Sequence, residues 1–146
     1  MNKATRVLAS IVLALSSTAV LGDVTAKWTS ISESTVREAR EAPAAAQRGL
    51  AAAKDAMLAA RNASKESGNG HGNGNGGSAA NSQRHDAAIA VAAYAVLESL
   101  YPAQGETLAS QLAISLSYIP ETNAKAEGAA LGRRVGTGIV RALNGR

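Results

Sequence analysis

Apolar residues recur at spacings of three and four along most of this chain, and this periodicity restricts it to amphipathic α-helices. The pattern predicts five helices, which end near residues 41, 63, 100, 118 and 143. Pro43 suits the first turn of the second helix, while Pro102 and Pro120 close the third and fourth. The expected fold is all-α: about five helices in a partial bundle, with a flexible Gly/Asn-rich loop between helices 2 and 3.

The core of such a bundle must be built from small aliphatic side chains. The chain has no Phe and no Cys, and its aromatic residues are one Trp and three Tyr. Burial therefore rests on Ala, Leu, Val and Ile, each of which contributes less buried area than an aromatic ring. The absence of Cys excludes disulfides, thiolate metal sites and cysteine nucleophiles.

The first residues predict export. Lys3 and Arg6 precede an uncharged apolar run over residues 7–21, with small residues ahead of possible cleavage points after Ala19 and Gly22. This is the pattern of a secretory signal peptide, with a retained membrane anchor as the alternative. We expect a secreted or periplasmic protein that has no membrane segment after cleavage, since no other run approaches the ~20 apolar residues that a bilayer requires.

Four segments follow from these patterns. They are a signal peptide (residues 1–22), N-terminal helices (23–63), a Gly/Asn-rich flexible linker (64–83) and C-terminal helices (84–146). The linker prediction rests on the alternating glycines and asparagines of residues 68–77, which offer no apolar side chain to bury. The region from 23 to 31 is expected to be irregular, because capping boxes at Ser30 and Thr35 place the first helix start later.

Gly128, Gly132 and Gly136 recur at every fourth position of the last predicted helix and share one side of it. Glycines in a helix interior cost up to about 1 kcal/mol each relative to alanine, so a compensating contact is expected. In a bilayer this pattern would indicate a dimer. In an Ala-rich chain outside the bilayer it indicates close packing against another helix of the same chain.

No catalytic, cofactor-binding or metal-binding residue is predicted. His71 stands alone among glycines, and His85 and Asp86 are adjacent on a helix and so do not face each other. Asn62-Ala63-Ser64 matches a glycosylation acceptor that is common by chance. Arginines crowd the last fourteen residues without an acidic partner, but no aromatic residues alternate with them. A solvated helix face is therefore favoured, and nucleic acid is not an expected partner.

The order of several short segments resembles the amino-terminal helical portion of exported bacterial proteins of the vanadium-dependent haloperoxidase and PAP2-type acid phosphatase superfamily. The matching segments are Val-Thr-Ala-Lys-Trp (24–28), Ala-Met-Leu-Ala-Ala-Arg-Asn-Ala (56–63), Val-Leu-Glu-Ser-Leu-Tyr-Pro (96–102), Leu-Ser-Tyr-Ile-Pro (116–120) and Ala-Lys-Ala-Glu-Gly-Ala-Ala-Leu-Gly (124–132). Two positions depart from the family pattern, since family members often place a His and an acidic residue where Lys54 and Ala59 stand here.

The resemblance implies a truncated member of that superfamily, inactive alone, whose partner would be a catalytic helical bundle or a second copy. The family's oxyanion site uses Arg-Pro, Pro-Ser-Gly-His and Ser-Arg segments, and none occurs in this sequence, where the prolines follow Ala, Tyr and Ile. Vanadate or phosphate is thus implied only for a full-length relative, and no cofactor is expected in this chain. The alternative from a different class is a self-contained secreted helical binding or scaffold protein.

Overall fold

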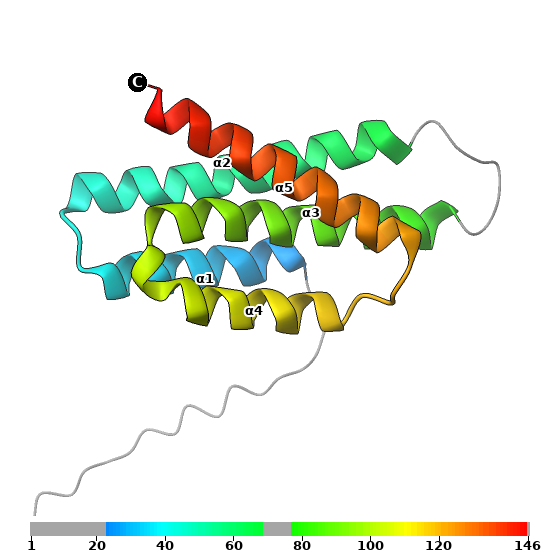
Figure 1. Ribbon diagram of the computed structural model, residues 1–146, viewed down its shortest axis with the longest axis horizontal. Helices are drawn as coiled ribbons and strands as arrows, with labels where there is room; N and C mark the ends of the chain where they lie inside the picture. Colours follow the sequence, from blue (N-terminus) through cyan, green and yellow to red (C-terminus); the bar gives the residue numbers. More distant parts are fainter. Residues whose placement is uncertain (1–22, 69–76, 146) are drawn as a thin grey trace, which may run out of the picture.

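A computed structural model describes residues 23–68 and 77–145. Its elements are α1 (Val24–Ala39), α2 (Pro43–Gly68), α3 (Gly77–Leu100), the 3-10 turn η1 (Pro102–Gln104), α4 (Gly105–Ser117) and α5 (Asn123–Asn144) (Figure 1). The all-α prediction is confirmed, since the described residues form helices and no strand. The predicted signal peptide and His71 lie outside the described residues.

Helix α1 begins well before its predicted start, so the expectation of an irregular segment over residues 23–31 is wrong. Asp23 is the N-cap, and its carboxylate accepts a hydrogen bond from the backbone N–H of Thr25 at 3.1 Å. Within the helix, Ser32 donates its hydroxyl hydrogen to the carbonyl of Trp28, four residues earlier. Trp28 is fully buried, and this burial favours helix over the whole segment.

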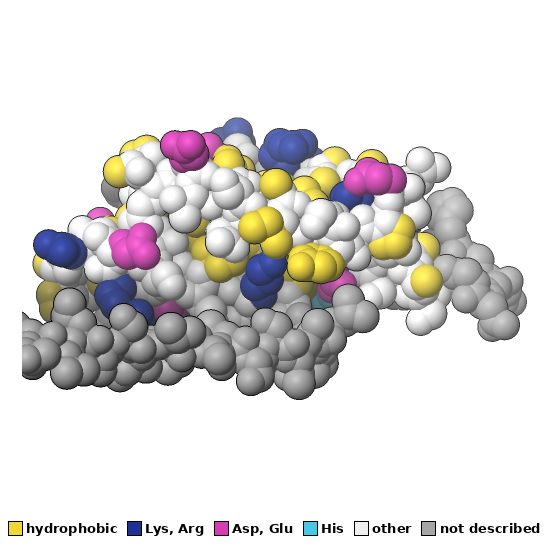
Figure 2. Space-filling view, turned by 90° about the horizontal axis from the view of Figure 1, so that it is seen from below, with side chains coloured by type: hydrophobic (Ala, Val, Ile, Leu, Met, Phe, Trp, Pro, Cys, Tyr) yellow, Lys and Arg dark blue, Asp and Glu magenta, His cyan; other side chains and the backbone are white. Residues whose placement is uncertain are grey.

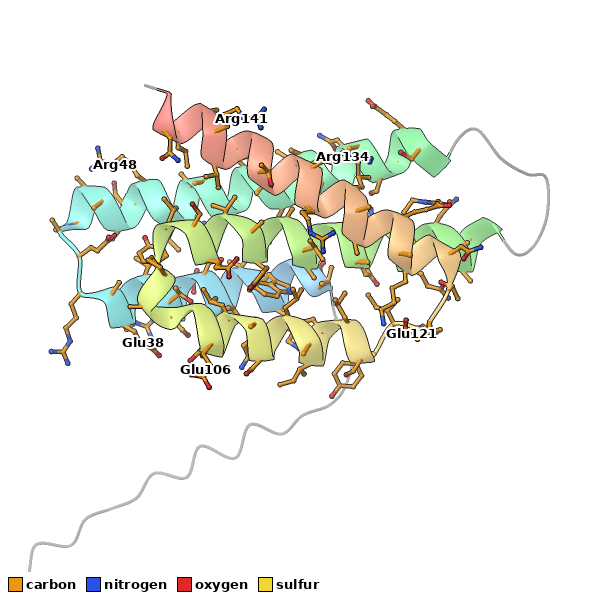
Figure 3. All side chains as sticks on the ribbon, in the orientation of Figure 1. Glu38, Arg48, Glu106, Glu121, Arg134 and Arg141 are labelled. Carbon is orange, nitrogen blue, oxygen red and sulfur yellow. The ribbon has the colours of Figure 1, made fainter. Side chains whose placement is uncertain are left out.

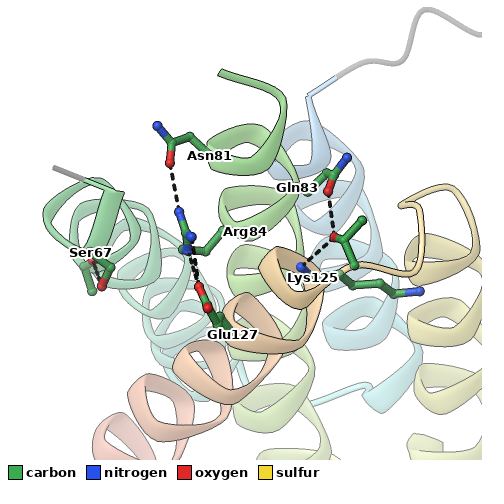
Figure 4. A network of polar contacts seen from close by, with 8 residues as sticks. Ser67, Asn81, Gln83, Arg84, Lys125 and Glu127 are labelled. Atoms are coloured by element: carbon green, nitrogen blue, oxygen red, sulfur yellow. Dashed lines mark hydrogen bonds and ion pairs between the residues drawn. The ribbon is translucent and has the colours of Figure 1, made fainter. Parts of the chain in front are cut away.

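The predicted linker over residues 64–83 is also too long, because α2 continues to Gly68 and α3 starts at Gly77. Polar contacts hold the extended N-terminal end of α3. Arg84 bonds Glu127 of α5 at 2.9 Å and Asn81 at 2.8 Å, and the Thr122 hydroxyl donates to Gln83 at 2.7 Å (Figure 4). The hydrogen bonds to Glu127 and Thr122, which lie far away in the sequence, stabilise the start of α3, and the composition of this segment alone does not predict them.

Helix α3 is the centre of the bundle and contacts all four other α-helices. Every residue from Ala87 to Ala93 is buried, so the helix is covered on all sides over two turns. A helix that is apolar on all sides is typical of a protein interior. The periodicity predicts a single buried face for this helix, but the buried surface of α3 is wider than that. The turn η1 then reverses the chain, and α4 returns antiparallel to α3 (Figure 1).

The remaining core lies between α1, α2 and α3. Trp28 and Val36 from α1 meet a run of buried residues on α2, which are Ala52, Ala53, Ala56, Met57 and Ala60. Alanine dominates, as the composition predicts. Among the described helices, none is both long and apolar enough to cross a membrane.

Candidate functional site

The three glycines of α5 lie buried against α3. A Cβ atom added at Gly128 would lie 2.2 Å from the carbonyl oxygen of Arg84, and one at Gly132 would lie 2.3 Å from that of Ala88. At Gly136 the nearest atom would be the Cβ of Ala95, at 2.7 Å. Real side chains do not fit at such distances, so glycine is what lets the two backbones approach. This face of α5 is therefore occupied within the chain.

Next to this contact, the strip of α3 between α5 and α4 is covered less completely. Between α4 and α5 a groove of ≈ 300 Å³ opens over the C-terminal half of α3. Its lining residues come from all three helices: Val91, Tyr94, Ala95, Glu98 and Ser99 from α3, Leu112 from α4, and Arg133, Thr137 and Val140 from α5. Figure 1 shows α3 running between α4 and α5 on this side. We call this the α4–α5 groove.

The α4–α5 groove has an apolar floor with polar groups at its edges. Leu112 and Val140 are only partly buried and pack against the core from either side. Tyr94 lies between them in the lining, and the pKa of its hydroxyl is raised, first by a hydrogen bond to Glu98 and then by burial. Glu98 is exposed at the end of the groove nearest the C-terminus of α3. The groove thus offers partly covered apolar side chains to a partner.

Arginines mark the α5 edge of the groove. Arg133, Arg134 and Arg141 are exposed, and together with Ala130, Thr137 and Gly138 they line a shallow depression that adjoins the groove through Arg133 and Thr137. Figure 3 shows Arg134 and Arg141 projecting from the same side of α5. Within the described chain, none of these three arginines forms an ion pair, because the two ion pairs present are Arg84–Glu127 and Lys125–Glu121. We call these three residues the α5 arginine edge.

Two large apolar side chains are exposed on α4 and at its C-cap residue. Ile114 is 45% exposed and Tyr118 is 70% exposed. The Lys27 ammonium lies 5.7 Å from the centre of the Tyr118 ring, a cation–π distance. Figure 2 shows this side of the molecule, where hydrophobic side chains gather near the middle among scattered charged groups. The apolar surface here is discontinuous, and the ≈ 250 Å³ groove between α1 and α4 is lined mainly by polar side chains.

A buried serine meets a histidine where α2 ends and α3 begins. The Ser64 hydroxyl oxygen lies 2.7 Å from Nδ1 of His85 and 2.9 Å from the carbonyl of Arg61. Sequence reasoning missed this contact because 21 residues separate the partners. The pair is not arranged as a nucleophile and base, since Ser64 is only 4% exposed and is held by two partners at once.

Charge surrounds this pair on several sides. Burial lowers the pKa of His85, with Arg61 and Lys65 adding to the decrease and Asp86 and Asp23 opposing it. Burial likewise raises the pKa of the neighbouring Asp86 carboxyl. The described residues contain no group of three or more His, Cys, Asp or Glu side chains placed to hold a metal ion. The contact between Ser64 and His85 connects α2 to α3.

Comparison of the sequence and structure with protein-family models, with curated proteins and with solved structures finds no match.

Proposed function

We propose that this chain is a self-contained exported helical binding module, which acts by contacting another macromolecule and has no catalytic role of its own. The observation that carries the proposal is the packing of Gly128, Gly132 and Gly136 against the α3 backbone. The glycine face of α5 is the surface best suited to close helix packing, and α3 of the same chain already covers it. The fold therefore does not depend on an external helix at that position. What remains for a partner is the α4–α5 groove and the α5 arginine edge.

A second candidate function follows from the resemblance to the haloperoxidase and PAP2-type phosphatase superfamily. In that reading the chain is an N-terminal helical portion that packs against a catalytic helical bundle, or against a second copy of itself. The partly covered floor of the α4–α5 groove, with Leu112 and Val140 packed from one side only, favours an added helix. Vanadate or phosphate chemistry would belong to that other bundle.

The two candidates differ in where the stability of the helices comes from. The experiment is thermal unfolding of residues 23–146, followed by circular dichroism at several protein concentrations. A self-contained module should unfold in one cooperative transition whose midpoint does not depend on concentration. A broad melt, or one that sharpens only as concentration rises, would contradict the first proposal and favour helices that require a partner.

A further inference from the structure

We infer that the α4–α5 groove binds an amphipathic helix that carries acidic side chains along the edge facing α5. The inference rests on the proposed binding function and specifies the partner. Its physical basis is the combination of the groove, which has an apolar floor and Arg133 in its lining, with the adjoining depression on α5 that holds Arg134 and Arg141. Each of these features restricts the partner in a different way.

The floor fits a helix. The α3 residues that line the groove run from Val91 to Ser99, which spans roughly 12 Å at 1.5 Å per residue, about two turns of a docked helix. Leu112 and Val140 are exposed to the groove in part, and Ala95 between the walls is small. Apolar residues at i, i+3 or i+4 and i+7 of a docked helix would cover this floor, as in other helix-in-groove complexes.

The α5 arginine edge favours a partner that carries acidic residues. Arg133 lines the groove itself, and Arg134 and Arg141 extend the positive edge along α5. No acidic residue follows Glu127 in the sequence, and Glu127 is paired with Arg84. Guanidinium groups bind carboxylates through paired N–H donors, so Glu or Asp on the partner would complete hydrogen bonds that this chain leaves to solvent.

Polyphosphate partners fit the groove less well. Tyr94 is the only aromatic residue in the lining, and Glu98 lines the groove with it. Single-stranded nucleic acid would need exposed rings for stacking. Glu98 would repel carboxylates as well as phosphates, so it restricts the partner's acidic side chains to the α5 edge. A membrane surface is planar and would leave the concave floor uncovered. An amphipathic helix with acidic side chains would cover the apolar floor and pair with the α5 arginine edge at the same time.

The test uses the purified full chain and two designed peptides. Both are helical peptides of about 18 residues, long enough for appreciable helicity, with Leu on one face. One carries Glu along the flanking edge and the other carries Lys at the same positions. Binding is measured by fluorescence anisotropy of the labelled peptide. The wild-type chain should bind the Glu peptide at least about tenfold more tightly than the Lys peptide.

Three variants locate the site. Arg133→Glu with Arg141→Glu reverses the edge, and Ser99→Trp fills the groove from an exposed position on α3. Each should weaken Glu-peptide binding by about tenfold or more. The matched control is Lys54→Glu with Arg61→Glu, which reverses two charges in the ≈ 240 Å³ groove between α1 and α2. It should change binding less than twofold, by our estimate for charges outside the site.

Several results would overturn the inference. They are no Glu-peptide binding at about 100 μM, equal binding of both peptides, a larger loss in the Lys54 and Arg61 variant than in the arginine-edge variant, or unchanged binding by Ser99→Trp. Tighter binding of RNA or anionic vesicles than of the Glu peptide would also overturn it in favour of a phosphate partner. A cooperative, concentration-independent melt alongside any of these would leave the binding-module proposal standing, so the two failures are distinguishable.

Discussion

Replacing Gly132 by alanine tests whether the contact between α3 and α5 is as close as the structure shows. The new Cβ would lie 2.3 Å from the Ala88 carbonyl oxygen and 3.0 Å from the Cβ of Val91. The first of these atoms belongs to the backbone and cannot rotate away, so α5 must move. Overpacking costs about 3 kcal/mol at the upper end of its usual range, and the gain in helix propensity offsets about 1 kcal/mol. The expected net loss is about 2 kcal/mol of unfolding free energy.

Gly138→Ala is the matched control on the same helix. A Cβ at Gly138 would meet nothing within 4 Å, so only the propensity gain remains. The control should be more stable than wild type by up to about 1 kcal/mol. Urea unfolding followed by circular dichroism, with all three proteins in one buffer, gives both differences.

The sign of each change decides the outcome. Gly132→Ala should lower the urea midpoint and Gly138→Ala should raise it, at an unchanged dependence of free energy on urea. If Gly132→Ala were as stable as wild type, or if the two variants could not be told apart, the close α3–α5 contact would be wrong. The assignment of Gly128, Gly132 and Gly136 to helix packing would then fail with it.

Three further perturbations test other parts of the fold. The hydroxyl of Tyr101 donates to Glu41, and burial together with this bond raises its pKa to about 12. Stability should therefore fall as pH rises from about 10 towards 12, and Tyr101→Phe should remove that fall in urea unfolding at alkaline pH. The pKa of His85 is lowered in the folded chain, so neutral His85 should contribute to the free energy of unfolding above pH ~6.5, and this contribution should decline as pH falls below that value. His85→Gln should reduce the difference in stability between pH 7.5 and pH 5, measured by unfolding at both values. Thr122 caps α5 by accepting from Lys125 N–H at 3.2 Å. Thr122→Ala should cost about 1 kcal/mol in urea unfolding, whereas Thr122→Ser should cost little.

Helix positions that depend on proline were predictable from the sequence. Pro43 begins α2, and α3 and α4 end shortly before Pro102 and Pro120. Proline acts through its own ring and the residue before it, so no tertiary information is needed. The Thr122 cap of α5 is equally local. These elements explain why the all-α prediction succeeds.

The start of α1 was not predictable in the same way. Thr35 resembles a capping residue in sequence, but in the structure its hydroxyl donates to the Ile31 carbonyl inside the helix. A threonine hydroxyl can either cap a helix start or bond a carbonyl inside a helix. Burial of Trp28 favours the second arrangement, because it extends the helix before Thr35. The contact of Ser64 with His85 and that of Arg84 with Glu127 likewise depend on which helices become neighbours. Periodicity identifies the buried face of a helix but not its partner.

The groove and the tight helix contact follow from the same difference between two helices. Helix α5 presents Gly128, Gly132 and Gly136 to α3, whereas α4 packs Leu108 and Leu112 against the core at the same four-residue spacing. Glycine lets α5 settle onto α3 along much of its length, and its contact with α3 is far more extensive than that of α4. Leucine side chains hold α4 further out, since each occupies the space between the two backbones. With one helix close and the other held away, a strip of α3 between them stays open, and this strip is the floor of the α4–α5 groove. Enlarging Gly136 to leucine should therefore displace α5 and alter the groove together with the packing, which links the stability of this fold to the shape of its proposed binding surface.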